Sequence, residues 1–357
     1  FRAVPGARDA VRPVPEVLEA EARALVEAHV AGLPFVAHLV RGDRYRPGKS
    51  AQTDAELLAV PLGLEQAREA IARWHQYPGW AAAAAAPGTV DPLFESACDA
   101  IVSGDLAALR TLIGQRPSLS DARSPFPHHA TLLQHLSANG IENHRQWQSP
   151  ANAVELAELL LEAGAEPDAP CDCYGGGWTA MTLLVTSCHP HKAGVQADLV
   201  EALCRRGAKP NGPEDDGAPL WWALGFFYTA AADRLVHCGA RVDNLLFAAA
   251  AGDLEAVKCY FDGQGRLRPD RAHSWGRSVA PARKLDADHM LEYALIYAAA
   301  HGRCPVVELL LTKGPDLQVK EPMWKNTALG AAECARRPEM VARLKPLYAR
   351  AEAEREG

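Results

Sequence analysis

Four segments of the chain share a pattern in which apolar residues recur three and four positions apart. This spacing places the apolar side chains on one face of a helix. In each segment a glycine, which can take the left-handed conformation, ends the helix, and a short extended arm containing Asp or Asn follows. The segments are residues 156–168, 199–211, 232–243 and 306–317. The pattern predicts a helix, stop and turn unit that is repeated along the chain.

Runs of apolar and small residues precede these units and predict a second helix in each repeat. Small side chains allow the two helices of a pair to lie close together. The runs begin at Ala130, Thr179, Ala218, Asn244 and Leu295. The sequence therefore predicts an all-α fold of stacked helix pairs.

The first helix of a repeat begins with a recurring motif. The motif reads Thr131-Leu132-Leu133, Thr179-Ala180-Met181, Ala218-Pro219-Leu220 and Thr327-Ala328-Leu329. Together with the glycine that ends each second helix, it makes the chain resemble the ankyrin-repeat family, whose repeat spans about 33 residues and starts with a Thr-Pro-Leu-His-like sequence. The resemblance implies an ankyrin-repeat solenoid of about six irregular helix-pair repeats over residues 91–345.

The repeats depart from the family length. Among the spacings between stopping glycines, the 32 residues from Gly207 to Gly239 come closest to it. A shorter spacing indicates a repeat without a finger loop, in which Asp243 leads directly into Leu245. The longer spacings locate insertions at residues 140–149, 171–178, 189–194 and 264–288.

Residues 1–90 lack the repeat pattern. They predict an amphipathic helix at 14–33, a capping box formed by Thr53 and Glu56, and another helix at 64–74. This segment resembles the small helical unit that precedes ankyrin repeats in a group of bacterial proteins. Because the first helix pair of an array would otherwise expose an apolar face, we interpret residues 1–90 as an N-terminal cap. Residues 346–357 are interpreted as a polar C-terminal tail.

Charge and composition narrow the classes of partner. The formal net charge is -7, and the charged residues are spread along the chain, so no basic face for nucleic acid is predicted. No apolar run reaches the roughly 18 to 20 residues that a membrane span requires. The nine cysteines lack scaffold-like spacing, and the N-terminal residues show no signal-peptide pattern. We expect a cytoplasmic protein that binds neither nucleic acid nor membrane.

The stretch 171–191 contains five residues of the types that bind zinc, Cys171, Cys173, Cys188, His189 and His191. The spacing does not favour a metal site. A Cys-x-Cys pair in an extended arm places the two thiols side by side without closing a zinc knuckle. A predicted helix also separates the cysteine pair from the histidines by roughly 15 Å. No metal and no cofactor are predicted.

Three consecutive glycines, 175–177, lie in the same stretch. They are not followed by the Gly-Lys-Ser or Gly-Lys-Thr sequence of a phosphate-binding loop. The interpretation that we favour is a tight finger turn with positive φ angles. The alternative is that backbone N–H groups of this turn bind an anion.

Residues 128–155 are unusually polar for a helix pair and carry four histidines. Histidine readily exchanges protons near neutral pH, and stacking of repeats would bring this region close to the next finger. If the chain is an enzyme, the candidate acid–base residues are His135, His144, Asp172, Tyr174 and His189. The alternative is that these polar side chains satisfy loop backbones, with Gln134 or His135 at the place of the family's motif histidine.

The segment 220–228 holds five aromatic residues in nine positions. On a helix, Trp221, Gly225 and Tyr228 fall on one side, whereas Trp222 and Phe226 fall on another. One helix face therefore cannot bury all of them. They are expected either to pack against the insertion 264–288, with its Trp275 and Pro281, or to form a surface for a ligand or partner.

Two functions remain. The first is an ankyrin-repeat binding protein that recognises a protein partner with a concave surface of fingers and inner helices. Its candidate binding residues are Asn139, Gln146, Trp147, Tyr174, Trp178, Ser187, Trp221, Trp222 and Phe226. The alternative is an isomerase, lyase, cyclase or hydrolase that binds a small molecule between the insertions of repeats two to four and uses cofactor-independent acid–base catalysis. We favour the binding protein because no strong catalytic motif is present, including the Gly-x-Ser-x-Gly elbow that Ser187 would need.

Overall fold

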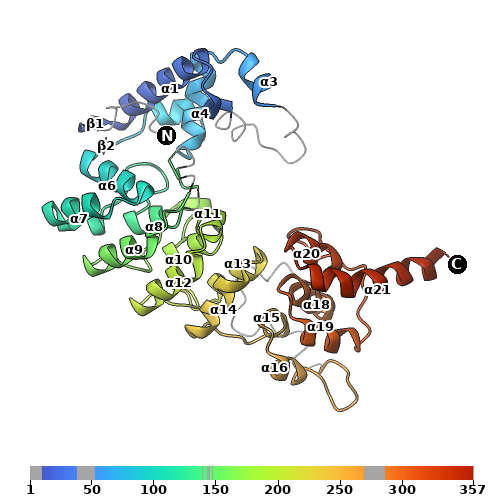
Figure 1. Cartoon of the computed structure of the whole chain (residues 1–357). Helices are drawn as coiled ribbons and strands as arrows, with labels where there is room; N and C mark the ends of the chain where they lie inside the picture. Colours follow the sequence, from blue (N-terminus) through green and yellow to red (C-terminus); the bar gives the residue numbers. More distant parts are fainter. Residues whose placement is uncertain are drawn as a thin grey trace. The chain divides into compact units, whose positions relative to one another are not determined.

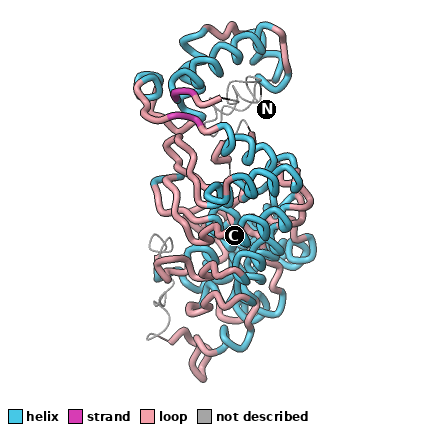
Figure 2. The backbone as a smooth tube through the Cα atoms, turned by 90° about the vertical axis from the view of Figure 1, so that its left-hand side faces the viewer, coloured by secondary structure: helices cyan, strands magenta, loops and turns pink. Residues whose placement is uncertain are grey.

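The computed structural model describes residues 10–37, 53–138, 140–142, 145–146, 148–268 and 286–356. The chain divides into two compact units, Phe1–Val195 and Gln196–Gly357, and each is described by itself. Helices dominate both units, and the described residues form a single two-stranded sheet (Figures 1 and 2). The predicted all-α fold class is confirmed.

The N-terminal segment of the first unit packs its helices around one apolar core. The elements are β1 (Arg12–Pro13), α1 (Val14–Val30), α3 (Asp54–Ala59), α4 (Leu64–Trp74), α5 (Trp80–Ala84) and β2 (Thr89–Val90). Strand β1 pairs antiparallel with β2, which fixes the start of α1 beside the end of the segment. The predicted helix at 64–74 and the capping box of Thr53 and Glu56 are confirmed, while the first helix ends at Val30 instead of residue 33.

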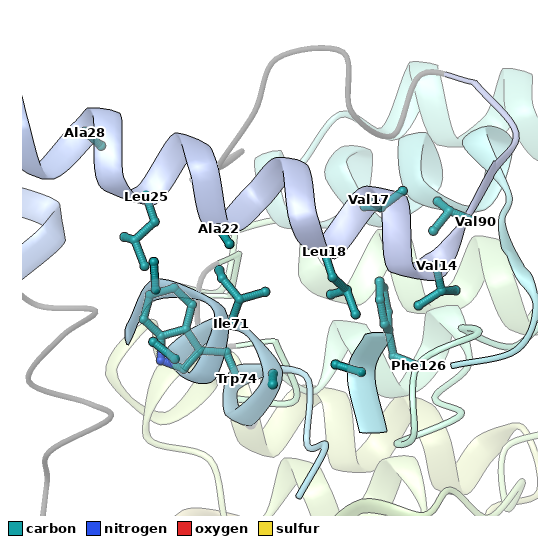
Figure 3. Packing of buried hydrophobic residues seen from close by; sticks show 14 of the residues in the cluster. Val14, Val17, Leu18, Ala22, Leu25, Ala28, Ile71, Trp74, Val90 and Phe126 are labelled. Carbon is teal, nitrogen blue, oxygen red and sulfur yellow. The ribbon is translucent and has the colours of Figure 1, made fainter. Parts of the chain in front are cut away.

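The core of this segment also contains Phe126, which belongs to the repeat region (Figure 3). Its side chain is fully buried among Leu18 of α1 and other apolar residues of the segment. The Phe126 ring lies 4.2 Å from the ring of His75. The His75 Nε2 atom in turn lies 2.8 Å from a carboxylate oxygen of the buried Glu21. The N-terminal helices and the loop that contains Phe126 therefore share one core.

The repeats of the first unit contain packed pairs of helices. Their elements are α6 (Pro92–Ser103), α7 (Leu106–Gln115), η1 (Pro117–Ser120), α8 (Leu132–Leu136), α9 (Ala153–Glu162), η2 (Cys173–Gly175), α10 (Ala180–Leu184) and α11 (Cys188–Lys192). Helices α8 and α10 start where the motif predicts, because the Thr131 and Thr179 hydroxyls accept hydrogen bonds from backbone N–H groups three residues later. Gln134 completes the capping box of α8 and so occupies the motif-histidine place.

The second unit continues the same helix-pair plan. Its elements are α12 (Gln196–Arg205), α13 (Ala218–Gly225), α14 (Thr229–His237), α15 (Leu245–Ala251), α16 (Leu254–Lys258), η4 (Ala287–His289), α18 (Met290–Ala300), α19 (Cys304–Leu311), α20 (Ala328–Cys334) and α21 (Pro338–Glu356). The shortened repeat is confirmed, because Asn244 directly caps α15 through the Phe247 N–H. Helix α21 runs through position 345, so the expected tail from 346 continues this helix.

A buried histidine ties four helices of the second unit together. His301 follows α18, and its Nε2 atom donates to the Leu224 carbonyl of α13 at 3.1 Å. Its Nδ1 atom accepts a hydrogen bond of 2.7 Å from the hydroxyl of Thr229, at the start of α14. The same hydroxyl accepts from Arg337, just before α21, at 2.6 Å. Burial lowers the pKa of His301 to about 3, so the imidazole is neutral.

Candidate functional site

The finger loop 171–178 is a closed turn. Cys171 N donates to the Trp178 carbonyl at 2.8 Å, and Trp178 N donates to the Cys171 carbonyl at 3.3 Å. The three glycines that follow Tyr174 all have positive φ angles, of 99°, 96° and 78°. The interpretation of these glycines as a tight turn with positive φ is confirmed.

Tyr174 stands at the tip of this finger with 60% of its surface exposed. Its ring lies 5.1 Å from the half-buried ring of Trp178 in an edge-to-face arrangement. The φ angle of Tyr174 is +51°, a left-handed conformation that costs a non-glycine residue roughly 1 to 2 kcal/mol. A strained, exposed aromatic side chain is a reason to look for function at this position.

The polar residues of the finger are held by local contacts. The Asp172 carboxylate lies 2.7 Å from His129 Nδ1, and both side chains are at least half exposed. Ser187 is buried and donates to the Ala138 carbonyl at 2.8 Å, while its oxygen accepts from the His189 backbone N–H. Ser187 therefore caps α11 and anchors the chain to the preceding loop. His189 is half-buried.

His135 and Gln146, which the sequence analysis names separately, lie together inside the first unit. The Gln146 amide nitrogen donates to His135 Nδ1 at 3.0 Å and to the His135 carbonyl at 2.7 Å. The other ring nitrogen, Nε2, makes no hydrogen bond within the described residues. Both side chains are only 1% exposed, and burial lowers the pKa of His135 to about 3. His135 is therefore a neutral interior side chain at neutral pH.

A buried group of charged residues surrounds this histidine. The Arg145 guanidinium pairs with Glu95 and lies 3.4 Å from carboxylate oxygens of both Asp99 and Glu142. Glu142 also lies 3.6 Å from the Nε2 atom of the buried His128. The nearby carboxylates raise the pKa of Arg145 well above its usual value, despite the opposing effect of burial. The arginine thus fastens the predicted insertion 140–149 to helix α6.

Glu95 is absent from the candidate residues of the sequence analysis. It lies on the buried face of α6, and only 2% of its surface is exposed. The available signal is an acidic residue three positions before the buried Cys98, on a helix face that is otherwise apolar. A charge in that position requires a buried partner, although periodicity alone does not identify Arg145.

The aromatic segment 220–228 divides between core and surface. Trp221 is 2% exposed, and its ring lies 6.5 Å from Phe247 and 6.0 Å from Tyr297. Trp222 and Phe226 are half-buried, with ring centroids 6.2 Å apart. The predicted separation of Trp221 from Trp222 is confirmed. The prediction is wrong for Tyr228, whose ring stacks on Phe226 at 6.0 Å, because the helix ends at Gly225. The expected contact with Trp275 and Pro281 lies outside the described residues.

A second finger loop, 321–326, lies against this aromatic segment. The Trp324 ring meets Phe226 edge-on at 5.5 Å, and its Nε1 atom donates to the Gly225 carbonyl at 2.7 Å. Gly225 permits this approach, because a Cβ atom there would come within 3.2 Å of Met323. Trp324 remains 46% exposed.

The backbone of this finger is fixed from inside by Glu321. Its fully buried carboxylate accepts hydrogen bonds from the N–H groups of Met323, Trp324 and Asn326 at 2.6 to 3.2 Å. Trp324 is therefore presented by a preorganised loop. Trp324 is not among the residues predicted from the sequence, although a tryptophan shortly before the helix-capping Thr327 is a signal for an aromatic finger.

Three candidate residues, Asn139, His144 and Trp147, lie outside the described residues. Within the described ranges, no group of three or more His, Cys, Asp or Glu side chains could hold a metal ion. Among the helices of those ranges, none is both long and apolar enough to cross a membrane. Asp172 and Tyr174 share one finger, while His135 lies in the interior and has no hydrogen bond to either of them in the described structure.

Comparison with solved structures finds ankyrin repeat domains. The human ASB11 ankyrin repeat domain has 20% sequence identity and a TM-score of 0.37, over 69% of this chain and 96% of that chain. The ankyrin repeat domain of Bcl-3, a member of the IkappaB protein family, has 19% identity and a TM-score of 0.36, over 70% of this chain and 97% of that chain. No protein-family model and no curated protein matches the chain.

Proposed function

We propose that the chain is a protein-binding module of the ankyrin type, in which finger loops recognise a segment of a partner protein. One observation carries the proposal. Among the large apolar side chains that are exposed in the described residues, the two beyond residue 90 are Tyr174 and Trp324. Both are aromatic, and each stands in a finger loop, one in each unit.

Tyrosine and tryptophan are the residues that most often dominate the free energy of protein binding. They offer a large contact area with few rotatable bonds, so they lose little conformational entropy on binding. Here both backbones are fixed in advance, by the closed turn around Tyr174 and by the Glu321 carboxylate beneath Trp324. Preorganisation of this kind reduces the cost of association.

The neighbouring candidate residues have different roles in this proposal. Trp178, Trp222 and Phe226 are half-buried and extend the two aromatic contacts. Gln146, Ser187 and Trp221 are buried, so they support the loops and helices without contacting a partner. The proposed surface comprises the fingers and the adjoining inner helices. The sequence predicts that this surface is concave. Acid–base catalysis by His135, His144, Asp172, Tyr174 or His189 stays a prediction.

The proposal is tested by alanine substitution, with a partner recovered by affinity capture and then purified. Tyr174→Ala and Trp324→Ala are expected to raise the Kd by about 30-fold, the effect of losing roughly 2 kcal/mol at a hot spot. Val30→Ala is the matched control, because Val30 is 82% exposed but lies at the end of α1. An unchanged Kd for both aromatic variants would reject the fingers as the binding surface.

A further inference from the structure

Cys171 and Cys173 form a pair of buried thiols within the finger loop 171–178. Their residue exposures are 2% and 0%, respectively. Both side chains belong to one buried cluster, and Trp178 packs against it. The other members of the cluster are Ala130, Ile141 and Leu183. The two thiols therefore point into the same small interior region.

The backbone between the two cysteines turns at Asp172. This residue has φ -91° and ψ 13°, in the sparsely populated region next to the helical one. In a helical conformation the first and third Cα atoms lie about 5.5 Å apart. Disulfides span Cα separations of about 4.4 to 6.8 Å and most often about 5.5 to 6 Å. A bond between Cys171 and Cys173 consequently needs little movement of the chain.

We propose that Cys171 and Cys173 are a redox-active dithiol that reacts with low-molecular-weight disulfides such as oxidised glutathione. In the first step the Cys171 thiolate attacks one glutathione sulfur, forms a mixed disulfide and releases one glutathione thiolate. In the second step Cys173 loses its proton and attacks the Cys171 sulfur. This step closes the Cys171–Cys173 disulfide and releases the second glutathione. The dithiol loses two electrons and two protons, and oxidised glutathione becomes two reduced molecules.

The contacts of the two thiols indicate which one attacks first. A hydrogen bond from Cys173 to Cys171 lowers the pKa of Cys171, because it stabilises the thiolate. The same interaction raises the pKa of Cys173. The Arg123 guanidinium donates to the Pro170 carbonyl, next to Cys171, at 2.6 Å, and this nearby cation also favours a thiolate at Cys171. Because the thiolate is the nucleophile in exchange reactions, we assign Cys171 as the attacking residue and Cys173 as the resolving residue.

Because both thiols are buried, exchange requires transient local opening of the finger, a minor state that leaves the closed, preorganised form as the major one. Two backbone hydrogen bonds between Cys171 and Trp178 close the turn. Within the turn, the three glycines allow rearrangement at low steric cost. Tyr174 follows Cys173 directly, so the disulfide would also change the backbone conformation next to the exposed Tyr174 ring. That consequence rests on the proposed binding function, whereas the thiol chemistry does not.

The test uses the full chain with Cys188→Ser, because Cys188 is exposed and shares the tryptic fragment 146–192 with the pair. The folded protein is equilibrated in glutathione buffers of increasing oxidised fraction, trapped by alkylation and digested. We expect this fragment to become lighter by two hydrogens and to escape alkylation, reversibly, while circular dichroism stays unchanged. Cys98, which is fully buried on α6, is the internal control and stays a thiol.

Single substitutions on the same background test the assigned order. Cys173→Ser is expected to retain one glutathione on Cys171, at a yield about tenfold or more above that of glutathione on Cys173 in Cys171→Ser. The proposal is overturned if the fragment stays a dithiol in oxidised glutathione, or if its disulfide forms only in the unfolded chain. Equal yields of bound glutathione in the two single variants overturn the assignment of Cys171 as the attacking thiol. None of these readouts depends on a binding partner.

Discussion

Individual residues of this chain carry conformations that their own chemistry does not favour. Tyr174 is the clearest case, because a bulky side chain occupies a left-handed backbone position in a loop that already has three adjacent glycines. A glycine at 174 would relieve the steric conflict between Cβ and the backbone. The tyrosine thus contributes its ring at the expense of local stability, as expected for a binding residue.

This strain gives a stability prediction that is independent of any partner. Tyr174→Gly is expected to be more stable than Tyr174→Ala by about 1 kcal/mol, because both lose the ring and only alanine retains the Cβ conflict. At Asp172, where φ is -91°, the order is expected to reverse. Chemical denaturation of the four variants measures both differences. An alanine variant at 174 that is at least as stable as the glycine variant contradicts the assigned strain.

His301 gives a second prediction at the residue scale. Its pKa is about 3 in the folded unit, because burial and the nearby Arg303 and Arg337 disfavour the protonated imidazole. The hydrogen bond to the Leu224 carbonyl acts in the opposite direction and raises the pKa. In the unfolded chain an imidazole titrates near pH 6.5. Between these values the unfolded state binds more protons, so stability falls as the pH falls from 6.5 toward 3. The slope is about 1.4 kcal/mol per pH unit.

The measurement compares wild type with His301→Gln by denaturant unfolding at pH 6.5 and pH 4.5. The variant is less stable at pH 6.5, because it loses the contacts with Leu224 and Thr229. We expect the difference between the two proteins to shrink by about 2 kcal/mol at the lower pH. A pH-independent difference would show that His301 is not held neutral in the folded state.

At the scale of elements, the buried Arg145 joins the loop before α9 to helix α6. Arg145→Ala leaves the Glu95 and Glu142 carboxylates buried without their main cation. The expected loss is about 3 to 5 kcal/mol in the free energy of unfolding. The control is Arg343→Ala, which removes an exposed ion pair with Glu308 and changes stability little. Similar small losses for both variants would contradict a structural role of the buried cluster.

Local signals in the sequence predict where these helices begin and end, but they do not predict which helices and loops contact one another. Thr131 and Thr179 mark helix starts because a cap acts within one turn, and the structure places both as caps. The partners of Glu95 and Trp324 lie about 50 and 100 positions away along the chain. No periodicity encodes such pairings. For the same reason the sequence names Phe226 as a surface aromatic residue and misses the tryptophan that meets it.

At the scale of the whole chain, the N-terminal segment and the repeats of the first unit are joined through a shared core. Figure 3 shows Phe126 beside Leu18 and Val14 of α1. The interpretation of residues 1–90 as a cap that covers the first repeat stays a prediction. The sequence does not predict that Phe126, in the loop 121–130, enters the core of the N-terminal segment.

Phe126→Ala is therefore expected to destabilise the first unit by about 3 to 5 kcal/mol and to reduce hydrogen-exchange protection in α1 and α4. Phe94→Ala is the matched control, since Phe94 is also buried but lies on α6 and packs beside His135 of α8. Phe94→Ala should destabilise the repeats without a preferential loss of hydrogen-exchange protection in α1 and α4. Unchanged protection of these two helices in Phe126→Ala would mean that the segment is stable without the contact.

The most direct test of the binding account is site-specific photocrosslinking within cells that express the full chain. A photoreactive phenylalanine analogue replaces Tyr174 or Trp324, and the control carries it at Val30, which is more exposed than either. We expect both finger positions to crosslink to the same discrete protein and position 30 not to crosslink to it. Crosslinking that is equal at all three positions, or absent from both fingers while the complex persists, contradicts recognition by the aromatic fingers.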